Sequence, residues 1–430
     1  MEENQDNQDV SQLTQEVQQY KTYPKKWYIL TLFCLLASSQ YLVWNVFGPI
    51  ESSMKYAFEW NDTVLAEQPL WGTIILVLLV FQLGALQEKY GLYFSVSTAS
   101  LLMALGASAR FMFIENYPFT VTAHIGSFFN GITGIAVMSL PPALSAAWFP
   151  PEQRTLATCI AQVSTQVGTG LSFTLGPLIV PGKTQSDISA EAKNQTDVDE
   201  VKDQVHKYLV GQGAFAIVLF FLIILTFQDK PASPPSASAS LPRTDFWTAF
   251  HALRKDRNAV LCTLAYGASG GTFLAWQSVM SVNFQNIGVS DATSGKIGLT
   301  ICICCAVGSV IVAYATDHLK KHMKLTLITL LLIEAIFFTW MTLILAKAIP
   351  FYLWQLYVSS VVGSVCTFSL VPLFFEYTVE LTYPTPEGLV GGFLACFYNF
   401  VGTIFLCMFF FHNIGYLWIN VLLICGAVCK

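Results

Sequence analysis

Apolar stretches of this chain carry aromatic and amide side chains that could bind a small solute. An indole face attracts a cation or stacks on a flat ring, and a side-chain amide both donates and accepts hydrogen bonds. Polar groups inside a membrane face a cavity or a partner. We therefore predict a substrate site; helix–helix hydrogen bonding and core or interfacial tryptophan are the alternatives. The predicted site residues are Trp44, Asn45, Gln166, Trp276, Gln277 and Asn399, accompanied by Tyr41, Tyr266 and Tyr398.

Two carboxylates, Glu376 and Glu380, follow a long apolar run. We predict that they act as gate or proton-coupling groups; a solvated helix end is the alternative. A further acid, Glu334, lies inside another apolar run, and His124 is a candidate for pH sensing. The sequence shows no Ser/His/Asp set, metal-ligand spacing or phosphate loop. We therefore expect no enzyme, no metal and no cofactor.

The composition is that of a membrane protein. Of the 430 residues, 54% are hydrophobic and 11% are charged, against about 25% charged residues in soluble domains. The formal net charge of -5 is small, and a nucleic-acid partner would require a basic face that the sequence does not show. These values predict an all-α polytopic membrane protein whose surroundings are the lipid bilayer, with no nucleic-acid partner.

The apolar runs divide into two sets of six around a polar, Pro- and Ser-rich connection. We predict a disordered tail over residues 1–26, one half over 27–227, a linker over 228–258 with an amphipathic segment at 246–253, and a second half over 259–430. The last helix is short, which indicates either an abrupt end or a truncated sequence. The expected helices are 27–50, 68–83, 92–114, 120–144, 156–180, 208–227, 259–283, 295–315, 325–346, 351–374, 388–410 and 414–429.

Charge and sequons agree on one orientation. Basic residues gather in the tail, the linker and every second short loop, which predicts that these segments and the N-terminus are cytosolic. Two N-x-(S/T) sequons, at Asn61 and Asn194, lie in loops on the opposite side, where glycosylation takes place. We expect both asparagines to be glycosylated.

A short octet between the second and third apolar runs carries two glycines and two charges at fixed offsets. Gly84, Glu88, Lys89 and Gly91 fit the pattern G-x-x-x-(D/E)-(R/K)-x-G, and a partial echo ends at Asp317. This pattern resembles the loop signature of the major facilitator superfamily. The resemblance implies twelve transmembrane helices in two six-helix halves that rock around a solute. Gly84 would allow two helices to approach, and Glu88 would face a helix N-terminus.

Further segments resemble solute carrier family 49, which contains the feline leukaemia virus subgroup C receptor-related proteins and disrupted in renal carcinoma 2. The resemblance implies transport of choline or ethanolamine, with haem also proposed, in one branch, and lysosomal export of pyridoxine (vitamin B6) in the other. Trp44 and Gln166 look like the cation-contacting Trp and the helix-5 Gln of the choline branch, whereas Leu274 and Asn399 differ from that branch. Trp276, Asn399 and the pair Trp44-Asn45 look more like the pyridoxine branch. The segments are 41–50, 148–154, 175–181, 295–300 and 375–388.

We therefore predict a monomeric transporter of a small, pyridoxine-like organic solute, with a coupled proton as one option. Choline, ethanolamine and haem are alternative solutes, and a non-transporting receptor or sensor is an alternative class. The expected location is the lysosomal or plasma membrane.

Overall fold

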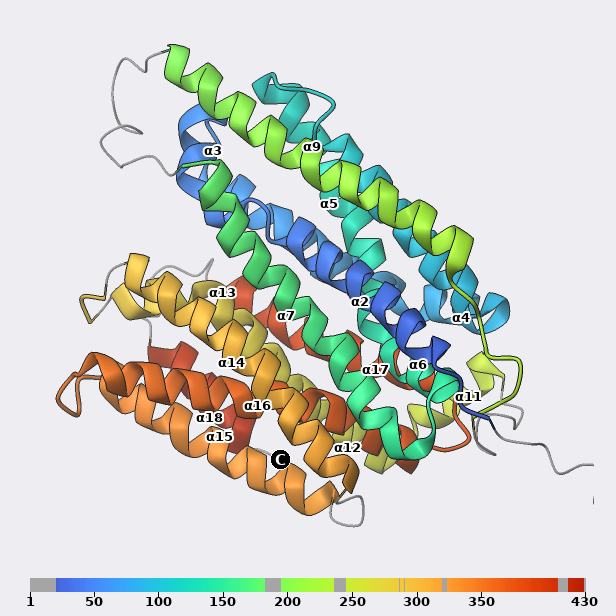
Figure 1. The fold of residues 1–430 in the computed structure, drawn as a ribbon. Helices are drawn as coiled ribbons and strands as arrows, with labels where there is room; N and C mark the ends of the chain where they lie inside the picture. The colour runs from blue at the N-terminus through green and yellow to red at the C-terminus, as the bar shows by residue number, and fades with distance from the viewer. Residues whose placement is uncertain are drawn as a thin grey trace, which may run out of the picture.

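A computed structural model (Figure 1) describes residues 21–181, 195–235, 245–285, 287–289, 291–318, 323–408 and 417–428. Its first group of elements is α2 (Lys25–Trp44), η1 (Gly48–Ile50), α3 (Glu51–Phe58), α4 (Asp62–Ala109), α5 (Asn116–Ser139), α6 (Pro141–Trp148), η2 (Pro151–Gln153), α7 (Arg154–Ile179) and α9 (Gln195–Thr226). After α11 (Phe246–Leu253), the second group is α12 (Arg257–Tyr266), η3 (Gly267–Gly271), α13 (Thr272–Gln285), α14 (Asp291–His318), α15 (Met323–Leu345), α16 (Leu353–Leu381), α17 (Glu387–Cys407) and α18 (Leu417–Val428).

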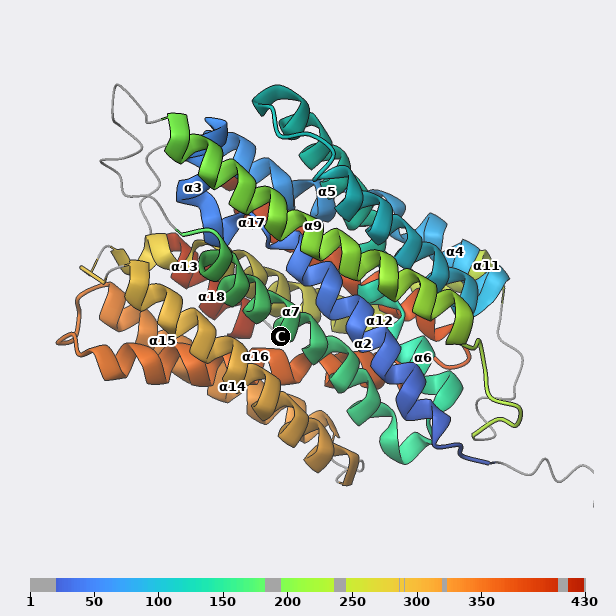
Figure 2. The ribbon, with the colours of Figure 1, turned by 45° about the horizontal axis from the view of Figure 1, so that its top comes forward.

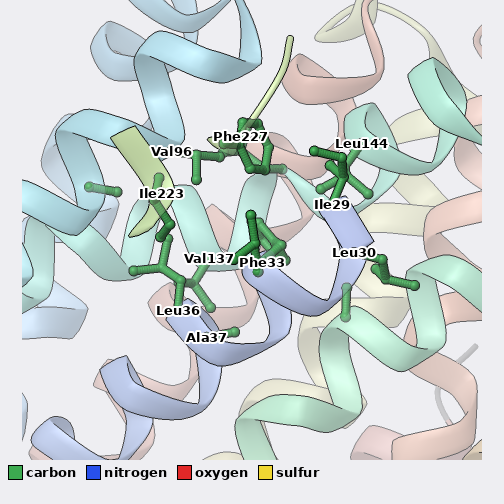
Figure 3. Packing of buried hydrophobic residues seen from close by; sticks show 14 of the residues in the cluster. Ile29, Leu30, Phe33, Leu36, Ala37, Val96, Val137, Leu144, Ile223 and Phe227 are labelled. Carbon is green, nitrogen blue, oxygen red and sulfur yellow. The ribbon is translucent and has the colours of Figure 1, made fainter. Parts of the chain in front are cut away.

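The two groups form two bundles that lie side by side, and each has a core of its own (Figures 1 and 2). In the N-terminal bundle, Phe33 and Leu36 of α2 pack with Val137 of α5 and Ile223 of α9 (Figure 3). The largest core of the C-terminal bundle gathers buried residues from α13 to α18.

Small residues allow the helices within a bundle to touch. A Cβ atom added at Gly168 of α7 would lie 2.0 Å from the backbone oxygen of Ser38 in α2. One turn earlier on α7, the Ser164 carbonyl accepts a hydrogen bond from Ser38 Oγ at 2.7 Å. Since lipid tails are as apolar as the helices, close backbone approach and interhelical hydrogen bonds are what hold membrane helices together.

Several helix boundaries differ from those predicted. The helix expected at 27–50 ends at Trp44, and the one expected at 351–374 continues to Leu381. The helix expected at 120–144 ends at Ser139 and restarts at Pro141 as α6, because two consecutive prolines fit only the first turn of a helix. Residues 51–58 form α3 where a loop was expected. Helix α9 begins at Gln195 rather than near residue 208, because Val198, Val201 and Val205 recur at helical spacing in its polar first half and pack against α3.

Within the described residues, nine helical stretches are long and apolar enough to cross a membrane. One of them, Glu67–Ala109, has 43 residues, about twice the length that a single crossing needs. The amphipathic segment predicted at 246–253 is confirmed as helix α11. A Cβ atom added at Gly84 would lie 3.2 Å from the Phe246 ring of α11, so the lack of a side chain at Gly84 allows α11 to pack closely against α4.

The octet bends α4 at Gly91, where φ is 85° and ψ is 179°. The Asp229 Oδ1 atom accepts a hydrogen bond from the Tyr93 backbone N–H at 3.0 Å. The carboxylate at this helix start is thus that of Asp229, and the expectation that Glu88 faces a helix N-terminus stays a prediction. Glu88 and Lys89 are exposed. Asp317 lies in the last turn of α14, and its side chain is outside the described residues.

Replacing Gly91 with alanine should destabilise the protein by about 1–3 kcal/mol from backbone strain alone, because only glycine readily adopts this conformation. The added Cβ would also lie 2.5 Å from Asp229 Oδ1 and disturb the bond to Tyr93. We expect a lower apparent Tm and a lower yield of monodisperse protein. Gly211→Ala is the matched control, since nothing lies within 4 Å of its Cβ position. Equal melting of the two variants would contradict this prediction.

Candidate functional site

The two bundles meet at one end of the molecule. We call the end at which α2 begins the tail side, and the opposite end, where α3 lies, the α3 side. On the tail side, a Cβ atom at Gly391 of α17 would lie 2.4 Å from the Ser139 carbonyl oxygen of α5. The Phe81 ring of α4 lies 6.1 Å from that of Phe393 in α17. These backbone and ring contacts close the tail side between the bundles.

The last turns of α2 present aromatic rings. Trp44 stacks on Tyr41 with ring centroids 6.2 Å apart, and both side chains are partly exposed. The indole lies against two glycines. A Cβ atom added at Gly72 would lie 1.9 Å from Trp44 Cη2, and one added at Gly134 would lie 3.4 Å from Trp44 Cζ3. The rotamer of Trp44 is thus set by glycines of α4 and α5, which no local sequence pattern singled out.

The C-terminal bundle supplies a second aromatic pair. Tyr266, at the end of α12, stacks on Tyr398 of α17 with centroids 5.5 Å apart. Tyr41 of α2 lies close enough to Tyr398 and Tyr266 for the phenol groups to interact electrostatically. Aromatic side chains from helices α2, α12 and α17 are therefore brought together across the plane between the bundles. We call Tyr41, Trp44, Tyr266 and Tyr398 the aromatic group.

Two of the predicted amides differ in how fully they are hydrogen-bonded. Gln166 of α7 is buried, and its Oε1 atom has no hydrogen-bond partner among the residues that the structure describes. Asn399, next to Tyr398, donates from Nδ2 to the Ala395 carbonyl at 2.9 Å and to the sulfur of Met138 in α5 at 3.4 Å. Met138 of the N-terminal bundle thus contacts Asn399 of the C-terminal bundle. The sequence patterns did not predict this contact. A buried acceptor without a partner is costly, so Gln166 is ready to accept a hydrogen bond from a ligand.

Asn45 mainly fixes the helices around this group. Its Nδ2 atom donates to the Tyr41 carbonyl at 3.0 Å and to Thr169 Oγ1 at 3.4 Å. Its backbone carbonyl accepts from Ser172 Oγ at 2.7 Å. These bonds fasten the end of α2 to α7, which makes Asn45 a support for Trp44.

The structure places Trp276 in the core of the C-terminal bundle. Its side chain is fully buried, with the ring 5.9 Å from Phe273, 6.2 Å from Phe284 and 6.0 Å from Phe338. It is therefore not brought together with Trp44 as the sequence suggested. Gln277, the next residue, is partly exposed.

The acidic residues occupy different environments. Glu376 is buried near the tail-side end of α16, whereas Glu380 is exposed. Glu334 of α15 is fully buried and accepts a hydrogen bond from Ser269 at 3.1 Å. Ser269 lies in the π-helical turn η3, which begins directly after Tyr266. Such turns often occur at functional sites.

The remaining predicted residues lie apart from the aromatic group. Asn61 caps α4, accepting from the Val64 backbone N–H at 2.9 Å, and it is exposed. Asn194 is outside the described residues. No group of three or more possible metal ligands occurs among the described residues. A hollow between two stretches of α4 and α5 shares no residue with the aromatic group.

Comparison with known proteins agrees with this architecture. The sequence model of the Major Facilitator Superfamily matches residues 33–406. The chain is 30% identical over 405 residues to the Solute carrier family 49 member 4 homolog of Xenopus laevis, covering 93% of this chain and 88% of that protein. It is 25% identical over 394 residues to the Choline/ethanolamine transporter FLVCR2 of Homo sapiens, covering 90% and 71%.

Among solved structures, the fold is similar to that of FucP, a transporter of the Major Facilitator Superfamily in the outward conformation. The TM-score is 0.68 at 15% identity, over 93% of this chain and 97% of that one. The family match and the relatives confirm the resemblance predicted from the octet and from the segments of the first and tenth helices. The chain belongs to the major facilitator superfamily of transporters and, within it, to solute carrier family 49.

Proposed function

We propose that this transporter carries a small organic solute with a flat, polar ring, and that pyridoxine is the first candidate. One observation carries the proposal: aromatic side chains from both bundles gather in one group. On α7, which packs against α2, the buried amide oxygen of Gln166 has no partner among the described residues. The stacked faces of Trp44 and Tyr41 suit a flat ring. Gln166 Oε1 would accept a hydrogen bond from a hydroxyl of the solute, which would relieve its unpaired state.

Choline or ethanolamine is the second candidate, favoured by the same aromatic faces. Indole and phenol rings attract an organic cation by about 2 kcal/mol or more when water is excluded. Relatives that match about 90% of this chain are named choline/ethanolamine transporters. The hydroxyl of choline or ethanolamine would donate to Gln166 Oε1 as a hydroxyl of pyridoxine would. The two candidates therefore differ in the charged ammonium group that the rings would attract, and not in their need for Gln166.

Transport would occur by rocking of the two bundles. We propose that the tail side is the cytosolic side and that the described arrangement opens toward the α3 side, since the close contacts of Gly391 and Phe393 are on the tail side. Closure of the α3 side would then require these contacts to separate. Buried Glu376 lies near the tail-side end of α16, and we propose it as the gate group; exposed Glu380 is a weaker candidate for that role.

The test is uptake into proteoliposomes of labelled pyridoxine, choline and ethanolamine, at about pH 5.5 and pH 7.5, the range in which histidine titrates. Saturable pyridoxine uptake supports the first candidate, and choline or ethanolamine uptake alone supports the second. Saturable binding without accumulation, in liposomes that hold folded protein, would instead indicate the receptor alternative.

Gln166→Ala should weaken binding of pyridoxine about tenfold, the value of one net hydrogen bond of roughly 1.4 kcal/mol. Choline affinity should fall as well, because the choline hydroxyl is also a donor to this acceptor. Gln212→Ala is the matched control, since Gln212 of α9 is also a buried amide with an atom lacking a partner. Pyridoxine affinity that is equal in both variants and in the wild type would remove Gln166 from the site.

A further inference from the structure

A buried arginine holds the end of α2 just before Trp44. Arg110, at the end of α4, is 2% exposed and donates from Nη1 to the Val43 carbonyl at 2.5 Å. Its Cζ atom lies 5.2 Å from the ring centroid of Phe47. No ion pair is found for it within the part of the chain that the structure describes, so its charge is met there by neutral oxygen atoms and a ring. Burying a cation costs free energy of desolvation, which its hydrogen bonds must offset.

The other hydrogen bonds of Arg110 lead to the α3 side. Its Nη2 atom donates to Ser127 Oγ at 2.8 Å, and Ser127 donates to Gln68 Oε1 at 2.8 Å. The Nε2 atom of Gln68 lies 3.3 Å from Nδ1 of His124, which is partly exposed. Four side chains from α4 and α5 thus form a continuous chain from a titratable imidazole to the Val43 carbonyl.

The direction of every donor in this chain follows from chemistry. Trp71 Nε1, which can only donate, lies 3.0 Å from His124 Nδ1. Nδ1 must therefore be an acceptor, and the proton of the neutral ring is on Nε2, which lies 3.8 Å from Glu67 Oε2. Gln68 then donates to the same Nδ1 atom and presents its oxygen to Ser127. Each group therefore donates to the next, from Arg110 to Ser127, from Ser127 to Gln68 and from Gln68 to His124.

The geometry points to a pH relay: protonation of His124 weakens the hold of Arg110 on the end of α2, and with it the affinity of the solute site beside Trp44. A proton on Nδ1 meets two donors, Trp71 and Gln68. The indole must move away, and the Gln68 amide must turn its oxygen to the imidazolium. The N–H group of Gln68, instead of its oxygen, then faces Ser127 Oγ, so the Ser127 hydroxyl loses its acceptor. Ser127 Oγ must accept from both Gln68 and Arg110, and this competition weakens the bond from Arg110. Glu67 is the acidic group that faces the imidazole, with Oε2 3.8 Å from Nε2.

The effect on solute binding rests on the proposed function, whereas the relay itself does not. Lowering the pH from about 7.5 to 5.5 should reduce solute affinity, because the neutral ring is the form that completes the chain. His124→Gln should keep the high-pH affinity throughout, since a glutamine oxygen accepts but does not titrate. His206→Gln, which alters a partly exposed histidine of α9 whose ring lies beside Phe111, is the matched control and should retain the wild-type pH dependence.

A measurement that needs no solute tests the relay directly. Protein labelled with 5-fluorotryptophan in nanodiscs gives a 19F resonance for each indole, assigned with Trp44→Phe and Trp71→Phe. We expect the Trp44 and Trp71 resonances to titrate with one midpoint in the wild type, and neither to titrate in His124→Gln. In Ser127→Ala, the Trp71 resonance should still titrate while that of Trp44 should not.

Two outcomes would overturn the relay: a Trp44 resonance that does not move while Trp71 titrates, or one that titrates unchanged in Ser127→Ala. Failure of the proposed function is a separate result. In that case neither pyridoxine nor choline binds at either pH, while the fluorine titration still decides on the relay.

Discussion

Replacing Gly391 with alanine should reduce solute uptake by about 100-fold while leaving the protein folded. A Cβ atom at this position would lie 2.4 Å from the Ser139 carbonyl oxygen and 3.1 Å from the ring of Pro142. Both obstacles are rigid parts of the opposite bundle, so the bundles must separate on the tail side. Overpacking of this kind costs about 1–3 kcal/mol, and about 2.7 kcal/mol of that cost would shift the conformational equilibrium about 100-fold.

The expected shift can be seen at a native cysteine. Cys159 of α7 is fully buried among Val163 and Ala313, where α7 meets α14 on the tail side. Its alkylation by a membrane-permeant maleimide should be faster in Gly391→Ala than in the wild type. The apparent Tm should change little, because the core of each bundle is untouched.

A matched control separates this effect from a general response to glycine substitution. Gly170→Ala also adds a methyl group between the bundles, but its nearest neighbour, Cys302 Cβ, is at 4.0 Å, an ordinary contact. We expect wild-type uptake and labelling for that variant. Wild-type uptake in Gly391→Ala would show that the tail-side contact does not belong to the transport cycle.

Local patterns in the sequence were sufficient for much of the fold. Apolar run length and the octet predicted the family and a break between two helices within residues 84–91, which the structure places at Gly91 with residues 84–90 still helical, and the amphipathic pattern of 246–253 predicted α11. These features depend on residues close together in the chain. By contrast, the partner of the helix start after Gly91 is Asp229, which is 136 positions from Tyr93. No local pattern indicates which of several carboxylates reaches that backbone N–H.

The misplacement of Trp276 has a specific physical reason. The helical faces of the seventh membrane segment change within the π-helical turn Gly267–Gly271, because each π turn takes in an additional residue and rotates the remainder of the helix about its axis. Residue type and predicted span do not show on which face Trp276 lies, and a regular period continued from Tyr266 across this turn would not show it either. Trp44 lies in an uninterrupted helix, one turn after Tyr41.

Trp44→Ala should weaken solute binding about 30-fold, since it removes an aromatic face with an interaction energy of about 2 kcal/mol in a site that excludes water. Trp44→Phe should retain part of this affinity because a smaller ring can still stack against Tyr41. The measurement is equilibrium binding of labelled pyridoxine and choline to purified protein. Trp354→Ala, which removes an exposed indole of α16, is the control and should bind as the wild type does.

Trp276 provides the informative contrast, because both tryptophans were predicted to bind solute and the structure gives them different surroundings. Trp276→Ala should leave a cavity among Phe273, Phe284 and Phe338 and cost about 3–5 kcal/mol of stability. We therefore expect a marked fall in apparent Tm with nearly unchanged affinity, the reverse of Trp44→Ala. If Trp276→Ala instead abolished binding at an unchanged Tm, the solute would sit deeper in the C-terminal bundle than the aromatic group, and Trp276 would return to the site.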